Sequence, residues 1–364
     1  MSRPVVVHAA AVALAAALLV ILLYAALLYF SPREPVPDKS EATYVTAASP
    51  KTPLPLPDLV PHDPHQAAKD RPSVELSVVV PAYNESNRIE VMLRPAVEYL
   101  ETRDLTPPAT GSYEILIVDD GSSDGTSEHA IKIAERLEAD FGAKRGAVKV
   151  CKLVRNRGKG GATRHGVLHA SGSRILFVDA DGATAFEDLA LLEDELAALT
   201  AAQKDRNTAH GLVVGSRAHL VSTEAVVKRS ALRNLLMRGF HLYLSLLGLS
   251  SIRDTQCGFK LQTRATAQLL YPSLHSPGWI FDCELLLLAE RSGVPLREVG
   301  VRWKEVPGSK LDVIKDSIRM ARDLLVIRAN YLVGKWTTPS RIETGVPVAG
   351  NGVKVVGAEN KKKR

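Results

Sequence analysis

Cysteine is scarce in this chain of 364 residues, which contains three. Cys151, Cys257 and Cys283 are odd in number, far apart and in none of the spacings typical of a metal site. These features argue against a disulfide framework and favour a reducing compartment. A strong charge of one sign is also missing, because the formal net charge is +6 and part of it lies in residues 361–364. So small and scattered a charge argues against nucleic-acid binding but is compatible with anionic ligands or anionic lipid.

A nucleotide-binding P-loop is absent as well. The stretch RNRGKGGA, residues 155–162, is basic and rich in glycine, but it does not contain G-x-x-x-x-G-K-[ST]. Lys159 is therefore not a Walker lysine. It pairs either with groups of a bound ligand or only with solvent.

A long uncharged run occurs at the N-terminus, where residues 5–30 read VVVHAAAVALAAALLVILLYAALLYF. About 26 such residues suffice for a tilted transmembrane helix, and aromatic residues gather at its far end. A cleaved signal peptide is the alternative, but the run is long for one and no convincing cleavage site follows. We therefore expect a single-pass anchor, whose orientation the flanking charges leave open.

Both flanks of the remaining domain differ from it in composition. Residues 31–72 hold many prolines and no apolar periodicity, which predicts a semi-extended tether. Residues 336–364 form a polar tail that ends in KKKR and is expected to be disordered. Its last lysines resemble a dilysine retrieval signal of endoplasmic reticulum membrane proteins, although a solvated basic tail is an equal alternative.

The domain between them, residues 73–335, alternates between strand and helix patterns. Continuous β-branched runs predict buried strands, and apolar residues at helical spacing separate them. This order predicts an α/β fold with a mainly parallel, doubly wound sheet and flanking helices. The predicted strands are 76–80, 114–118, 148–154, 174–178 and 211–215, and the predicted helices are 88–101, 127–137, 163–170 and 189–202.

Two of these strands end in paired carboxylates. Asp119 and Asp120 follow EILIV, and Asp179 and Asp181 follow RILFV. Ligands of such sheets bind beyond the carboxyl ends of the strands, where converging carboxylates can hold a hard divalent cation. The competing interpretation is that these acids only cap turns and helices. Two such strand ends with a basic glycine-rich loop between them favour a site.

The motifs VVVPAYNES, ILIVDDGSSDGT, NRGKGGA and FVDADG occur in this order and resemble those of the GT-A (Rossmann-like) glycosyltransferases of family 2. GSR at 215–217, RDTQCGFKL at 253–261, WIFDCELL at 279–286 and GSKL at 308–311 narrow the resemblance to polyprenyl-phosphate transferases, and overall similarity narrows it to the dolichyl-phosphate β-glucosyltransferases. The resemblance covers residues 73–335. It implies inverting transfer of glucose from UDP-glucose to dolichyl phosphate, with a dolichyl-phosphate mannosyltransferase as the nearest alternative.

The resemblance also implies roles for residues of the donor site. Asp179 and Asp181 match the pair that holds Mg2+ or Mn2+ and the diphosphate. Lys159, in the preceding motif NRGKGGA, is a further candidate for donor binding. Related mannosyltransferases carry a glutamine where Ala183 stands here, so one metal ligand is missing or is replaced by water. The positions that match those around uracil and ribose are Pro81, Tyr83, Glu85, Val118 and Asp120.

An acceptor phosphate is already ionised at neutral pH, so no general base is required, only cations that hold it in line with the anomeric carbon. Arg217 and Lys310 match the phosphate-binding positions of the family best. Arg229 and Arg233 share a face if their segment is helical, which is equally typical of a solvated helix face. Asp254 and Asp282 resemble acceptor-side positions, where each either orients a sugar hydroxyl or pairs with an arginine.

Two segments, 235–252 and 318–336, mix apolar residues with arginines. They are predicted either as interfacial helices that contact membrane lipid or as helices of the core. A catalytically dead, lectin-like module is disfavoured by the intact carboxylates, and a processive synthase by the missing Q-x-x-R-W element. Because UDP-glucose is cytosolic and the thiols favour reduction, we expect an endoplasmic reticulum membrane protein whose catalytic domain faces the cytosol.

Overall fold

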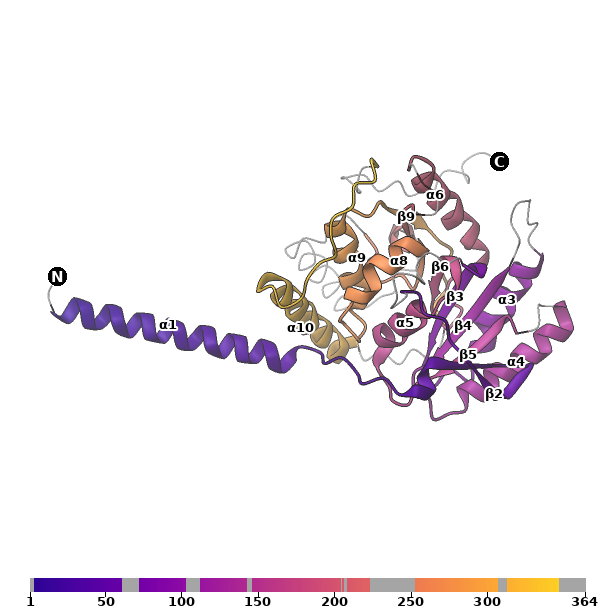
Figure 1. The fold of residues 1–364 in the computed structure, drawn as a ribbon, viewed down its shortest axis with the longest axis horizontal. Coiled ribbons are helices and arrows are strands. Elements are labelled where there is room, and N and C mark those ends of the chain that lie inside the picture. Colours follow the sequence, from indigo (N-terminus) through magenta and orange to yellow (C-terminus); the bar gives the residue numbers. More distant parts are fainter. Residues whose placement is uncertain are drawn as a thin grey trace.

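The structure, a computed structural model, describes residues 3–60, 72–102, 112–142, 146–203, 205, 208–222, 253–306 and 313–346. Its nine described strands form one sheet in the order β2-β1-β5-β4-β3-β6-β8-β7-β9 (Figure 1). Four parallel strands make the centre: β3 (Val74–Ala82), β4 (Tyr113–Asp119), β5 (Val148–Lys152) and β6 (Gly172–Val178). The predicted parallel α/β core is therefore confirmed.

One antiparallel strand interrupts this pattern. β8 (Phe259–Thr263) lies between β6 and β7 (Leu212–Ser216) and runs antiparallel to both, while β9 (Leu296–Gly300) pairs with β7 in parallel. The mixed half of the sheet therefore differs from a simple doubly wound pattern, although the sheet remains mainly parallel.

Helices cover both faces of the sheet. The helices α3 (Ile89–Thr102), α4 (Thr126–Phe141) and α6 (Leu189–Ala201) contribute to one apolar cluster with the side chains of alternate strand residues such as Val78 and Val80. On the opposite face, where Val79 and Phe177 point, lie α5 (Gly158–Leu168), α8 (Arg264–Leu270), α9 (Phe281–Ser292) and α10 (Val313–Leu332). The remaining described helical turns are 3-10 segments, η1 (Lys39–Ala42), η2 (Phe186–Asp188), η3 (Ala218–Ser222) and η5 (Tyr271–Ser273).

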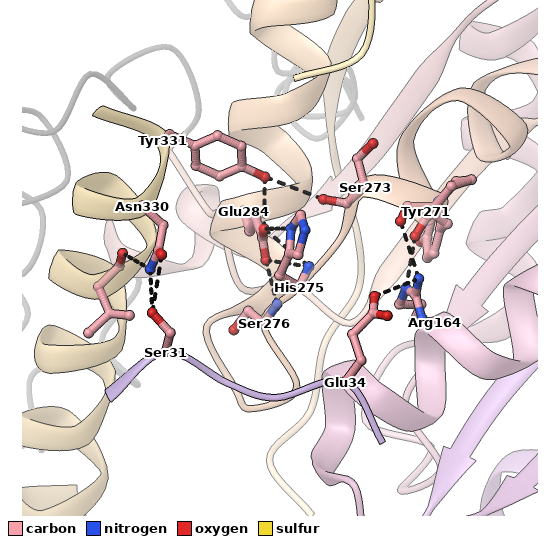
Figure 2. A network of polar contacts seen from close by, with 12 residues as sticks. Ser31, Glu34, Arg164, Tyr271, Ser273, His275, Ser276, Glu284, Asn330 and Tyr331 are labelled. Carbon is pink, nitrogen blue, oxygen red and sulfur yellow. Dashed lines mark hydrogen bonds and ion pairs between the residues drawn. The ribbon is translucent and has the colours of Figure 1, made fainter. Parts of the chain in front are cut away.

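The N-terminal helix α1 (Arg3–Phe30) extends away from the sheet, and its C-terminal end meets α10 (Figure 1). Ser31 fixes this junction, because its hydroxyl lies 3.1 Å from the side-chain oxygen of Asn330 and accepts a hydrogen bond from the amide nitrogen of the same residue (Figure 2). Among the described residues, no helix combines the length and the apolar character that crossing a membrane requires. The predicted membrane-spanning anchor at 5–30 is therefore not supported.

The predicted tether at 31–72 is partly folded, which corrects the boundary drawn at residue 73. β1 (Thr43–Thr46) and β2 (Ser49–Pro55) form a hairpin, and β1 extends the sheet by pairing antiparallel with β5. Leu59 is fully buried, and its amide donates to the carbonyl of Leu168 at 2.7 Å. The prolines fit because β2 is an edge strand, where a missing amide donor costs little.

The first part of the tail that was predicted to be disordered, residues 336–346, contacts the folded domain. Trp336 is 7% exposed, and the amide of Ile342 donates to the carbonyl of Ser292 at 2.9 Å. The rest of the tail, from residue 347, lies outside the described residues, as does the segment 235–252.

The segment 318–336, predicted either as an interfacial helix or as a helix of the core, contains most of α10, and one of its faces packs in the core. Leu324, Ile327 and Tyr331 pack into the core, whereas Ile318, Leu325 and Leu332 are more than half exposed.

Candidate active site

The loops after β3, β4, β5 and β6 meet at one edge of the sheet, because these strands are parallel. The first two loops are joined by hydrogen bonds between a backbone amide and a side chain. The amides of Asn84, Glu85 and Ser86 donate to the side chains of Ser122, Thr126 and Asp124, at 2.8, 2.9 and 3.1 Å. Asn84 adopts the left-handed conformation with a φ of 52°, and its side-chain oxygen accepts from the amide of Ser123. The motifs PAYNES and DDGSSDGT thus form one structural unit.

The two acids at the end of β4 have different surroundings. Asp119 is fully buried, and its carboxylate accepts hydrogen bonds from the amide of Ser122 at 2.7 Å and from the hydroxyl of Ser127. It caps the turn, so the interpretation that it lines the ligand-binding edge is wrong. The reason is that its side chain has donors within its own loop, which the strand pattern does not reveal.

Asp120 points instead towards the loop after β5. Its two carboxylate oxygens accept from the amides of Arg157 at 2.6 Å and Gly158 at 2.8 Å. Burial raises the pKa of Asp120 to about 7, although the two amides and the Arg157 charge act in the opposite direction. The turn after β4 and the glycine-rich loop after β5 are therefore connected through the carboxylate of Asp120.

Lys159 is next in the chain, at the beginning of α5, and its ammonium lies 2.7 Å from the Oδ1 of Asp179. The ammonium also lies 5.3 Å from the ring centre of Phe177 and 5.5 Å from that of Trp279. The same Asp179 carboxylate lies against Gly258. A Cβ at this position would come within 2.1 Å of a carboxylate oxygen, so residue 258 must be glycine. Lys159 therefore pairs with a protein carboxylate, which neither of its two interpretations, contact with a bound ligand or with solvent only, included.

Asp181 completes the acidic motif, and its Oδ1 accepts from the amide of Ala183 at 3.0 Å. Burial and the neighbouring charge of Asp179 raise its pKa. No cluster of three or more candidate metal ligands occurs within the described part of the chain. Two adjacent carboxylates that repel each other nevertheless fit a hard cation whose other ligands are phosphate and water oxygens.

Arg88 is a site residue that the sequence reasoning missed. Its guanidinium forms two hydrogen bonds, both 2.7 Å long, with the carboxylate of Glu85. This pairing, with smaller contributions from Asp181 and Asp179, raises the pKa of Arg88. The spacing of three residues to Glu85 at the start of a helix is the signal that could have indicated it. Arg88 adds a positive charge to the edge where Glu85 was predicted to bind donor.

Arg217 and Asp254 form a second bidentate pair on the other side of the site. The guanidinium donates to both carboxylate oxygens at 2.7 and 2.9 Å, and the Arg217 amide adds a third bond. Burial opposes ionisation, but Arg217 keeps the pKa of Asp254 below its usual value. The arginine also lies over the ring of Trp303, at 5.5 Å. Of the two roles considered for Asp254, pairing with an arginine is the one that the structure contains.

Asp282 is buried at the beginning of α9 and forms an ion pair with Lys260 of β8, which is also buried. Lys260 donates in addition to the carbonyl of Cys257 at 2.6 Å. Burial raises the pKa of Asp282, although Lys260 and Lys159 act against this shift. A buried, paired carboxylate suits positioning of its neighbours better than contact with a sugar. Sequence reasoning missed Lys260 because it lies within an apolar strand pattern.

The remaining predicted residues differ in their access to the site. Pro81 is partly exposed and Tyr83 is 43% exposed, both at the carboxyl end of β3. Val118 is fully buried in an apolar cluster with Leu116 and Cys151, so its side chain packs in the core and not against an exposed ligand surface. Lys310, Arg229 and Arg233 lie outside the described residues.

Known proteins are similar to this chain in sequence. The family model described as Glycosyl transferase family 2 matches residues 77–236. Dolichyl-phosphate beta-glucosyltransferase of Saccharomyces cerevisiae is 42% identical over 85% of this chain and 88% of its own length. The human protein of the same name is 45% identical over 73% of this chain and 79% of its own. Glucosyl-3-phosphoglycerate synthase from Mycobacterium tuberculosis, solved with uridine-diphosphate, is 20% identical over 80% of this chain and 91% of that chain, with a TM-score of 0.47. The identities of 42% and 45%, each over most of this chain and of the relative, show that the chain belongs to glycosyl transferase family 2, in its group of dolichyl-phosphate β-glucosyltransferases.

Proposed function

We propose that this enzyme transfers glucose from UDP-glucose to dolichyl phosphate with inversion, giving dolichyl β-D-glucosyl phosphate for assembly of the N-glycan precursor. The observation that carries the proposal is the identity to dolichyl-phosphate β-glucosyltransferases along nearly the whole described domain. The acids Asp179 and Asp181 could hold a metal ion. The nearby cations Arg88, Lys159 and Arg217 are suited to a diphosphate and a phosphate.

The donor would lie over the loops after β3 and β4. Tyr83 is exposed there, and Asp120 supplies carboxylate oxygens close to a basic loop. Lys159 pairs with Asp179, and Arg88 interacts electrostatically with Asp179 and Asp181, so both cations are placed to attract the diphosphate. These positions keep the nucleotide fixed while the anomeric carbon remains open to the acceptor.

Asp179 and Asp181 would hold Mg2+ or Mn2+. A divalent cation bound there neutralises charge that develops on the departing UDP. The chain's own contribution is to keep the two carboxylates together, by the Ala183 amide on one side and the Lys159 ammonium on the other.

The acceptor step needs no protein base. A phosphate oxygen of dolichyl phosphate attacks the anomeric carbon, the bond from that carbon to the UDP oxygen breaks, and UDP leaves with the electron pair. Arg217 is one third exposed despite its pairing with Asp254, so one edge of its guanidinium is accessible to phosphate. The pair holds the arginine in place, which favours in-line attack.

We further propose that the enzyme works at the endoplasmic reticulum membrane with its catalytic domain in the cytosol. Its acceptor is a membrane lipid, its donor is cytosolic, and its three cysteines are buried and free. The exposed side of α10 carries apolar residues such as Ile318 and Leu325 together with arginines such as Arg319 and Arg322. This composition is suited to a bilayer surface. An engineered glycosylation acceptor within residues 347–364 should remain unmodified, and efficient glycosylation there would contradict this orientation.

The activity is tested by offering radiolabelled UDP-glucose, GDP-mannose and UDP-GlcNAc, each with dolichyl phosphate, to the purified full-length chain. We expect a lipid-linked product from UDP-glucose. A product from GDP-mannose alone would replace this proposal by mannosyl transfer.

A further inference from the structure

Residues 38–60, here named the strap, precede the first motif of the glycosyltransferase domain and cross its β5 edge (Figure 1). The strap is fastened at several points. β1 pairs with β5 through Val45 and Val150, and the amide of Leu56 closes the hairpin on the carbonyl of Ala42. The nitrogen Nε2 of Gln268 donates to the carbonyl of Leu59 at 2.8 Å. The strap is therefore a fixed part of the domain surface.

Glu41 is the buried acid of this strap, with a side chain only 3% exposed. One carboxylate oxygen accepts from the amide of Val154 at 2.9 Å, and the other accepts from the amide of Asp38 at 2.9 Å and from the guanidinium of Arg157. Its backbone carbonyl contacts the Nε2 of His165 at 2.8 Å. Two of these three carboxylate contacts are made to the loop after β5.

Helix capping accounts for only one of these carboxylate contacts. At the beginning of η1 the Asp38 side chain accepts from the amide of Ser40, and the Glu41 side chain accepts from the amide of Asp38, which together form a capping box. Burying a carboxylate is costly unless charged and polar partners compensate it. The other two partners, Val154 and Arg157, lie 113 and 116 positions along the chain, so the burial of Glu41 holds the loop as well as its own helical turn.

The loop that Glu41 holds is the one that contacts Asp120. The guanidinium of Arg157 pairs with Glu41, while the backbone amide of the same residue donates to Asp120 at 2.6 Å. Gly158 donates the second amide, and Lys159 follows with its ion pair to Asp179. A continuous series of contacts thus connects Glu41 of the strap to Asp120 and Asp179, the two acids at the edge where the donor is proposed to bind.

The strap also lines a cavity of about 420 Å3 that opens beside this loop. Ser40 and Tyr44 form one side of the cavity, and Gly121 and Ser122, which directly follow Asp120, form another. Movement of the strap would therefore change the surroundings of the DDGS turn as well as the loop after β5.

We propose that Glu41 is a positioning residue of the donor site, which sets the position of Asp120 and Lys159 by holding Arg157 and Val154. The inference rests on the proposed function, because it takes the edge at Asp120 to be the site of the UDP moiety. Glu41 itself does not contact the donor. Its removal should weaken donor binding and leave acceptor binding intact.

The test compares full-length wild type with Glu41→Gln and Arg157→Gln. Both variants should bind UDP, in the presence of Mn2+, about tenfold more weakly by calorimetry, since each loses a charge-assisted contact with a buried partner. The KM for UDP-glucose should rise by a similar factor while the KM for dolichyl phosphate stays unchanged. In Glu41→Gln, amide hydrogen exchange at residues 154, 157 and 158 should accelerate, without acceleration in the central strands.

A double variant and a control complete the design. Glu41→Gln combined with Arg157→Gln should weaken UDP binding no more than either single change, because both remove the same pair. Glu34→Gln is the matched control, because Glu34 is an exposed acid that lies near Arg164 at 3.7 Å, beyond hydrogen-bond distance (Figure 2). It should match wild type in every assay.

Wild-type UDP affinity in Glu41→Gln, or fully additive losses in the double variant, would overturn the inference. A general acceleration of exchange with equal rises in both KM values would also overturn it, because that indicates a purely structural role. The proposed function fails separately, if wild type itself binds no UDP and transfers no glucose.

Discussion

The ammonium of Lys159 lies 2.7 Å from the carboxylate of Asp179, although this carboxylate is the one expected to hold a divalent cation. The lysine side chain is 15% exposed and lies near the rings of Phe177 and Trp279. A cation that binds Asp179 must therefore compete with a positive charge that is already there. This relationship gives a direct test of the acidic motif.

Lys159→Met should increase the affinity for Mn2+ alone by about three- to tenfold, because the ion no longer competes with the ammonium. Glucose transfer should fall, since the same ammonium is placed to attract the diphosphate. Mn2+ binding can be followed by electron paramagnetic resonance. Lys152→Met is the control, because Lys152 is 49% exposed and only approaches Glu128 at 4.0 Å. Unchanged or weaker Mn2+ binding in Lys159→Met would contradict the competition.

Asp181→Asn should lower glucose transfer by at least about 100-fold, because it removes a charge at the point where the diphosphate leaves. The fold should persist, since Asp181 follows the end of β6 and fills no core volume. Transfer assays in saturating Mn2+ and thermal unfolding measure the two effects. Asp194→Asn, at an exposed position of α6, should alter neither. Turnover close to wild type in Asp181→Asn would remove this residue from the reaction.

The central fold could be predicted from the sequence because its signals are local. Continuous apolar runs identified the strands β3 to β7, and the acids predicted at strand ends lie at the edge where the loops after the parallel strands meet. The direction of each acid could not be predicted in this way. Asp119 turns inward to Ser127 whereas Asp120 reaches the loop after β5, and this difference depends on donors that only the folded loop provides.

Partners distant in sequence account for the rest of what was missed. Lys260 and Asp282 come from different elements and meet in the interior, and Glu41 meets Arg157 from a segment whose prolines suggested a tether. The hairpin of β1 and β2 has little apolar periodicity because most of β2 is exposed. Such contacts depend on tertiary structure, so composition and periodicity do not indicate them.

Asp120 should make the stability of the protein depend on pH between about 4 and 7. Its pKa is raised from 3.8 to about 7 by burial, so the folded state binds a proton that the unfolded state has released. The contribution of this group is present below pH 4 and is lost as the pH rises towards 7. Urea unfolding of wild type should show this decrease, and Asp120→Asn should remove that part of the slope. An identical slope in both proteins would contradict the assignment.

Glu284→Gln should lower the free energy of unfolding by about 2–4 kcal/mol, because a fully buried carboxylate loses hydrogen bonds from several donors. Glu284 accepts from the amide of Ser276 at 2.6 Å and from the hydroxyl of Tyr331 at 2.9 Å (Figure 2). It also contacts His275, whose ring stacks on Trp336 at 4.3 Å. Urea unfolding followed by tryptophan fluorescence measures the effect. The exposed Glu34→Gln should change stability by less than about 0.5 kcal/mol, and equal losses in both variants would contradict the network's importance.

The acidic limb of the rate profile should follow the acceptor and not a side chain. If the nucleophile is a phosphate dianion, its second pKa of about 6 governs kcat/KM below neutrality. A phosphonate analogue of dolichyl phosphate with a different second pKa should move the limb by the same amount.

Asp282→Asn should leave the limb in place, since Asp282 is buried against Lys260. Asp254→Asn should lower the rate by loosening Arg217, which it holds with two side-chain bonds, but should not move the limb either. Arg217→Lys should raise the acceptor KM and lower kcat together, because a lysine cannot reproduce the bidentate contact. The mechanism without a base is wrong if the limb ignores the analogue's pKa and shifts in one of the two aspartate variants.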